Sequence, residues 1–224
     1  MQGSNKTKRI VAGALAAMVL AVALGWLWGA KKTRDLESSA RGSIAATTSL
    51  LQESLALSPD APDALARLEA HAKAVGQFLE ALRSEDAKRN RALAEAAELY
   101  LVDAQAILRN QTNATRARAA AGTSRRALSA HMNHAAGRGQ GWIDQAVSLK
   151  ARAERDNFDY RTSLGALADL LNAHRDTQAK VLAALPPARL LEQATVDAAF
   201  KRAKEAEQQA AADLERLRQM AIPR

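Results

Sequence analysis

Apolar residues recur at intervals of three and four along most of this chain, which is the spacing of amphipathic α-helices. After residue 34, no stretch of useful length alternates between apolar and polar residues as a half-buried β-strand does. The pattern therefore predicts an all-α fold of five or six helices, packed as antiparallel coiled-coil hairpins or as an elongated helical bundle. Residues that favour turns predict breaks near 58–62, 110–115, 137–141 and 186–187, with a weaker one at 122–124.

Each predicted helix after the first break has one apolar seam. The first helix is expected to end at about Leu57, before two closely spaced prolines. The second has a short coiled-coil seam of Leu65, Leu68, Ala72, Val75, Leu79 and Leu82. The third starts near residues 84–86 and carries Leu93, Ala97, Tyr100, Ala104 and Ile107. The fourth, from Trp142 to about residue 185, carries Tyr160, Leu164, Leu167, Leu171, His174, Gln178, Val181 and Leu185. The last, about 188–220, has a thin face of Ala199, Ala203, Ala206, Ala210, Leu214 and Leu217.

One segment near the start has no polar face, because its residues are apolar on all sides of a helix. Residues 10–30 contain no charged or strongly polar side chain, and as a helix they extend about 31 Å, the thickness of the hydrocarbon layer of a bilayer. We therefore expect a basic leader over 1–9, a transmembrane helix over 10–30 and an extramembrane helical domain over 31–224. The expected membrane-interface anchors are Trp26, Trp28, Lys31 and Lys32.

The transmembrane segment is interpreted as an uncleaved signal anchor. A cleaved secretory signal also has a basic start and an apolar run, but Trp28 stands where signal peptidase requires a small residue. Both flanks are basic, and a leader of this length is easily retained, so we expect a cytoplasmic N-terminus. Frequent Ala and Arg are typical of a GC-rich bacterium. The expected location is thus the bacterial inner membrane, crossed once, with the C-terminal domain in the periplasm.

Small residues recur every fourth position within the transmembrane segment. Such a line lets a second helix approach closely in lipid, and it predicts self-association or docking to another membrane subunit. Chance remains the alternative, since Gly and Ala are abundant there. The line consists of Gly13, Ala17, Ala21, Gly25 and Gly29.

The net charge of +8 does not indicate a nucleic-acid-binding protein. Six of the 32 basic residues precede residue 35, where no acid occurs, so they flank the transmembrane segment. From there on, 26 bases face 24 acids, and aromatic side chains for stacking are few. Residues 104–143 nevertheless hold six arginines and no acid, whereas 35–103 are acidic overall.

The arginine-rich region has two interpretations. It predicts either contact with an anionic partner, such as lipid headgroups or an acidic protein, or ion pairs with the acidic helices of the same bundle. The second interpretation is favoured. The candidate contacts are Arg109, Arg116, Arg118, Arg125 and Arg126.

No pattern in the sequence predicts catalysis, a cofactor or a metal site. The absence of cysteine excludes disulfide scaffolds, thiolate zinc sites and cysteine nucleophiles. Phosphate-binding glycine loops, nucleophile elbows and dinucleotide fingerprints are missing as well. His131 and His134 are spaced for one helix face, but basic surroundings oppose a metal ion there. His174 beside Gln178 indicates a polar layer that fixes the register of a helical seam.

These features favour a protein that acts by interaction rather than by catalysis. We expect a single-pass membrane-anchored helical scaffold, assembly factor or accessory subunit of a bacterial envelope complex, with a protein partner or a second copy of itself. The order of membrane helix and helical bundle also resembles the front half of bacterial chemoreceptors and sensor kinases. That resemblance implies ligand sensing, although residues 188–224 are too charged to form the second membrane helix of such receptors. A phage-type envelope tethering or lysis component is a further alternative.

Overall fold

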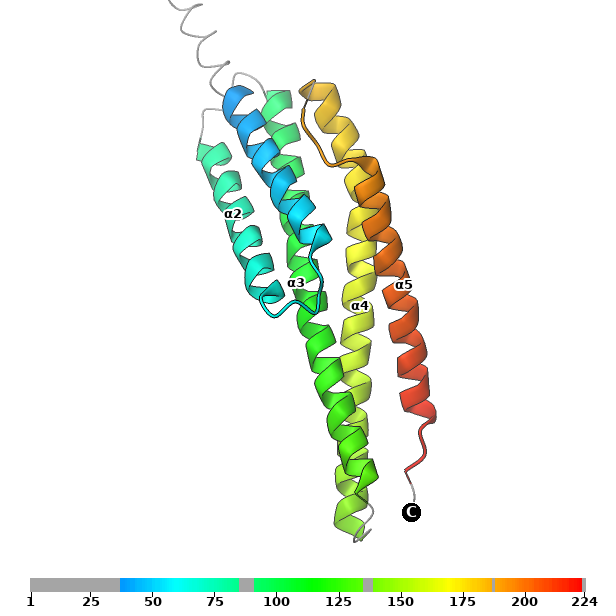
Figure 1. The fold of residues 1–224 in the computed structure, drawn as a ribbon. Coiled ribbons are helices and arrows are strands. Elements are labelled where there is room, and N and C mark those ends of the chain that lie inside the picture. Colours follow the sequence, from blue (N-terminus) through cyan, green and yellow to red (C-terminus); the bar gives the residue numbers. More distant parts are fainter. Residues whose placement is uncertain (1–36, 85–90, 135–138, 187, 223–224) are drawn as a thin grey trace, which may run out of the picture.

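The structure, a computed structural model, describes residues 37–84, 91–134, 139–186 and 188–222, and its regular elements there are all helices (Figure 1). The predicted all-α helical bundle is confirmed. The first described helix covers residues 37–56 and is called helix 37–56 below. The others are α2 (Ala64–Ser84), α3 (Arg91–Asn133), α4 (Gln140–Ala184) and α5 (Gln193–Gln219).

The helices run alternately up and down and form an elongated bundle (Figure 1). α3 packs against α2 and α4, and α4 packs against α5. Helix 37–56 and α2 are short, so they cover only one half of the long α3–α4 hairpin (Figure 1). The other half contains α3, α4 and α5 alone. Because helix 37–56 ends partway along the bundle, its C-terminus lies beside the middle of the long helices.

The core lies where the alternating apolar seams predict it. All five seam positions of the third predicted helix are buried in α3, and seven of the eight in the fourth are buried, six of them in α4 and Leu185 directly after its end. Tyr160, the eighth, is half-buried, as are Ala206 of α5 and Leu65 and Ala72 of α2. One large cluster joins helix 37–56, α2, α3, α4 and α5, and two small clusters continue along the three-helix half. The seams thus pack against one another, as heptad-like spacing requires.

The predicted break near 110–115 is wrong, and so is the weaker one at 122–124, because α3 continues without interruption from Arg91 to Asn133. The polar side chains in this stretch bond back to the preceding turn instead of capping a new helix. Asn110, Thr112 and Thr115 each donate to the carbonyl four residues earlier, at 2.8 to 3.0 Å. Such bonds satisfy these side chains inside a helix and remove the reason for a break.

Of the other predicted breaks, residues 58–62 lie between helix 37–56 and α2, and residue 186 follows the end of α4. In the predicted break at 137–141, α4 already begins at Gln140, and residues 137, 138 and 187 lie outside the described residues. The last helix begins at Gln193 and not near 188. Side chains of other helices contact the carbonyls of this connecting segment: Thr48 Oγ1 lies 3.2 Å from the Arg189 carbonyl oxygen, and Gln178 Nε2 donates to the Leu191 carbonyl at 3.1 Å. These contacts hold the segment against the core in a non-helical conformation.

The predicted transmembrane segment, 10–30, lies outside the described residues, together with its line of small residues and its interface anchors. Within the described part of the chain, none of the helices combines the length and apolar character needed to cross a bilayer.

Candidate functional site

A buried polar layer crosses the five-helix half of the bundle. His174 of α4 is completely buried, and its Nδ1 lies 2.6 Å from Oδ2 of Asp103 on α3. Its ring also contacts the ring of Tyr100, with centroids 5.3 Å apart. The Tyr100 hydroxyl lies 2.7 Å from Oγ1 of Thr48, which itself donates to the Ile44 carbonyl. His174 and Gln178 are therefore a buried polar layer in the core, as the sequence predicts.

Burial governs the ionisation of Tyr100. Its side chain is completely buried, and this raises the pKa of the hydroxyl to about 12; bonds to Thr48 and to the backbone of Leu191 oppose the rise, and the charge of Asp103 adds to it. The hydroxyl is therefore neutral in the folded protein at every physiological pH. Because the neutral group donates and accepts hydrogen bonds, it joins helix 37–56, α3 and the segment before α5.

The raised pKa of Tyr100 predicts a loss of stability at alkaline pH. An exposed tyrosine in the unfolded chain ionises near pH 10, while the folded protein keeps Tyr100 neutral to about pH 12. The stabilisation is thus complete below pH 10 and falls by about 2 to 3 kcal/mol as the pH rises through 12. Urea unfolding of the native chain and of Tyr100→Phe at several pH values measures this difference. Parallel pH profiles of the two proteins would contradict it.

The structure divides the predicted arginine contacts into two groups. Arg116 pairs with Glu69 of α2, Arg118 pairs with Asp60 at 2.7 Å, and Arg125 pairs with Asp213 of α5 at 2.5 Å. These ion pairs join α3 to segments far away in the sequence, in agreement with the favoured interpretation. The side chains of all three pairs are at least partly exposed, so each pair contributes little to stability.

The two remaining arginines lie on the surface of α3. Arg126 is exposed and bonds the Thr123 hydroxyl at 3.3 Å, and the exposed Arg109 forms no ion pair within the described residues. Three of the five arginines are therefore paired within the bundle, and two are exposed on α3.

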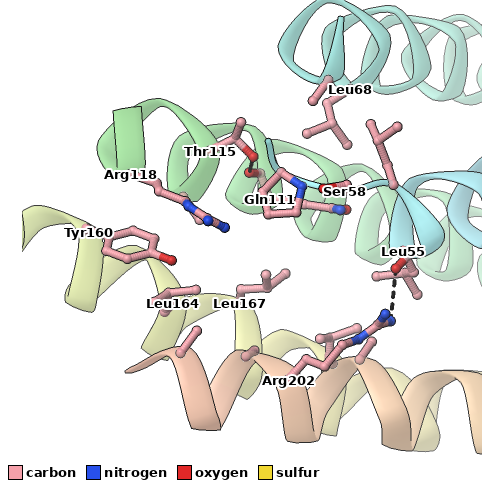
Figure 2. Close-up of a pocket in the computed structure, with 18 residues that line it drawn as sticks. Leu55, Ser58, Leu68, Gln111, Thr115, Arg118, Tyr160, Leu164, Leu167 and Arg202 are labelled. Carbon is pink, nitrogen blue, oxygen red and sulfur yellow. Dashed lines mark hydrogen bonds between the residues drawn. The ribbon is translucent and has the colours of Figure 1, made fainter. Parts of the chain in front are cut away.

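A cavity of about 270 Å³ opens where helix 37–56 ends (Figure 2). Pro59 and the turn after it lead the chain away toward α2, while α3, α4 and α5 continue past this point. The residues of α3, α4 and α5 that face this space are mostly alanine and leucine, and they leave it unfilled. The apolar lining consists mainly of Leu55, Leu68, Ala114, Leu164, Leu167, Leu171, Ala199, Ala203 and Ala206.

Polar groups from three helices surround this apolar lining. Gln111 of α3 donates from Nε2 to the Ser54 carbonyl at 2.6 Å, and its buried Oε1 has no hydrogen-bond partner within the described structure. Arg202 of α5 donates to the Leu55 carbonyl at 2.9 Å. Figure 2 shows the Arg118 guanidinium and the Tyr160 hydroxyl directed toward the same space. Burial raises the pKa of Tyr160, which keeps its hydroxyl neutral as a hydrogen-bond donor.

The far end of the bundle holds the histidine pair that the sequence singled out. His131 stacks on Trp142 with ring centroids 4.9 Å apart, and its Nε2 lies 3.0 Å from the Trp142 carbonyl. His134, one turn further, is exposed. Across the part of the chain that the structure describes, no three His, Asp or Glu side chains gather as a metal site requires. His131 instead joins the ends of α3 and α4.

The sequence did not indicate the cavity as a site. Its polar residues Gln111 and Thr115 belong to the stretch interpreted as a break, and Arg202 lies outside the arginine-rich region. Alanines at facing positions of α3 and α5 were the available signal, because small side chains on both sides of a seam leave space. Comparison with protein-family models, curated proteins and solved structures finds no match to this chain.

Proposed function

We propose that this protein is a membrane-anchored helical scaffold or accessory subunit that acts through protein–protein interaction in a bacterial envelope. Residues 10–30 anchor it in the inner membrane, with the N-terminus in the cytoplasm and the helical bundle in the periplasm. The apolar length of this segment and its basic flanks support the anchor. Within the membrane, the anchor associates with a second helix through its line of small residues, Gly13 to Gly29.

The direction in which the chain enters the bundle carries this proposal. Helix 37–56 starts at one end of the bundle, and the end of α3 and the start of α4 lie at the opposite end (Figure 1). A segment anchored before residue 37 therefore holds the bundle by one end. α4 has 45 residues, which extend about 67 Å at 1.5 Å per residue. The far end is thus available to a partner well away from the membrane surface.

Association of the anchor is testable at the small residues near its end. Changing Gly25→Leu and Gly29→Leu closes the face on which a second helix packs, and we expect disulfide crosslinking between anchors in native membranes to fall about tenfold. The natural chain has no cysteine, so Thr33→Cys supplies a single reporter thiol beside the anchor.

The control for this experiment is Ala23→Leu, which adds similar bulk on the opposite face of the same helix. It should leave the crosslinked fraction unchanged. Unchanged crosslinking in the double glycine variant, or equal loss in the control, would count against the packing face. Circular dichroism checks that the bundle is folded in each variant.

The cavity favours a second candidate function, namely ligand sensing. A half-open space with apolar walls and several convergent polar groups is the usual form of a small-molecule site. It lies among helix 37–56, α3, α4 and α5, so an occupant contacts both the helix nearest the anchor and the long hairpin. Ligand-dependent crosslinking of the Thr33→Cys reporter would support this function over a purely structural one.

A further inference from the structure

We propose that the cavity at the end of helix 37–56 binds a medium-chain carboxylate, an apolar chain of about eight carbons with one terminal negative charge. The proposal goes beyond the scaffold function and rests on the size, the walls and the charges of the cavity.

The volume limits the size of the occupant. An apolar cavity of about 150 Å³ holds a benzene ring of six carbon atoms, so a cavity of 270 Å³ accommodates about ten non-hydrogen atoms. This matches a chain of eight carbons and is far too small for a whole phospholipid. The walls are mainly leucine and alanine from all five helices, and Tyr160 at the edge is the aromatic side chain among the described lining residues. Such walls fit a flexible aliphatic chain.

The charged groups select the sign of the ligand. Among the described residues, two charged side chains line the cavity, those of Arg118 and Arg202. Asp60 neutralises the first through their ion pair, whereas the second donates to a neutral group, the Leu55 carbonyl, and forms no ion pair within the described part of the chain. The mouth therefore has an excess of one positive charge. The Arg202 guanidinium has five N–H donors, and those not used by Leu55 remain to bind a carboxylate in a charge-assisted hydrogen bond.

Neutral polar groups complete the site. The Tyr160 hydroxyl points into the cavity as a further donor (Figure 2). Gln111 fixes the end of helix 37–56 through Ser54, and its buried Oε1, which has no partner within the described structure, is available as a hydrogen-bond acceptor. A carboxylate needs donors and the chain needs apolar walls, and the lining of the cavity offers both.

Thiol protection tests the proposal on the full chain in lipid nanodiscs. Because the chain has no cysteine, Ala206→Cys places one thiol in the cavity wall. Octanoate should slow its reaction with a maleimide, and 1-octanol, which has the same chain without the charge, should protect about tenfold less well at equal concentration. Butyrate, with the charge and a short chain, should give no protection.

Two controls separate the cavity from the bilayer. Ala166→Cys of α4 is similarly half-buried but lies outside the cavity, so its labelling rate should not respond to octanoate. Arg202→Gln in the reporter chain should remove the advantage of octanoate over 1-octanol, while Arg155→Gln, an exposed arginine away from the cavity, should preserve it. Absence of protection by octanoate, equal protection by octanoate and 1-octanol, or equal protection of both thiols would overturn the proposal.

Discussion

Changing His174→Ala is expected to lower the free energy of unfolding by about 3 to 5 kcal/mol. The imidazole is completely buried between α3 and α4, so its removal leaves an unfilled space in the core. It also takes away the hydrogen-bond partner of Asp103, whose side chain is itself only 11% exposed. The two losses add, because a buried carboxylate without a partner is destabilising apart from any cavity. Urea unfolding followed by circular dichroism measures the change.

Two comparisons show whether the buried layer causes this loss. His134→Ala removes an exposed histidine at the end of the bundle and should change stability by less than about 0.5 kcal/mol. A double-mutant cycle with Asp103→Ala should give a coupling of about 1 to 3 kcal/mol between the two side chains. Equal effects of the two histidine variants, or additive effects in the cycle, would contradict a special role for the pair.

The fold could be predicted from the sequence because one physical signal dominates it. The seam residues of α3 and α4 repeat at helical spacing, and burial in a helical bundle needs little more than that repeat. The prediction of a break at 110–115 is wrong because Thr112 and Thr115 are equally suited to capping a helix and to forming a hydrogen bond with its preceding turn. The local sequence does not distinguish these two states. Contacts across the bundle, such as that of Gln111 with Ser54, favour the continuous helix.

The candidate site was harder to predict because it depends on where one helix stops relative to three others. Pro59 reveals that helix 37–56 ends, but not which residues of α4 and α5 lie beside that end. Arg202 is an ordinary basic residue in the sequence, and only the bundle brings it to the Leu55 carbonyl. The ion pairs of α3 were easier to predict from the sequence, since a basic helix between acidic neighbours places opposite charges close together.

The second large effect concerns the anchor. Changing Leu20→Arg and Leu24→Arg puts two charges near the centre of the proposed transmembrane helix, and each costs about 2.5 to 3.5 kcal/mol there. Together they should move most of the protein from the membrane fraction to the soluble fraction. Both substitutions lie outside the helical bundle, so the circular dichroism of the bundle should be unchanged. Ultracentrifugation of lysed cells and immunoblotting measure the distribution.

A charge-matched control adds two positive charges to the surface of the bundle instead of to the anchor. Ala151→Arg and Asn172→Arg both lie at exposed positions of α4 and should leave the protein in the membrane fraction. Extraction at high salt distinguishes a spanning helix from surface attachment, because attachment by basic residues alone weakens as salt screens the charges. A native chain released by salt, or a doubly charged anchor that stays in the membrane, would refute insertion of residues 10–30. Retention of the native chain and release of the charged variant would leave an inserted apolar helix as the physical basis of anchoring.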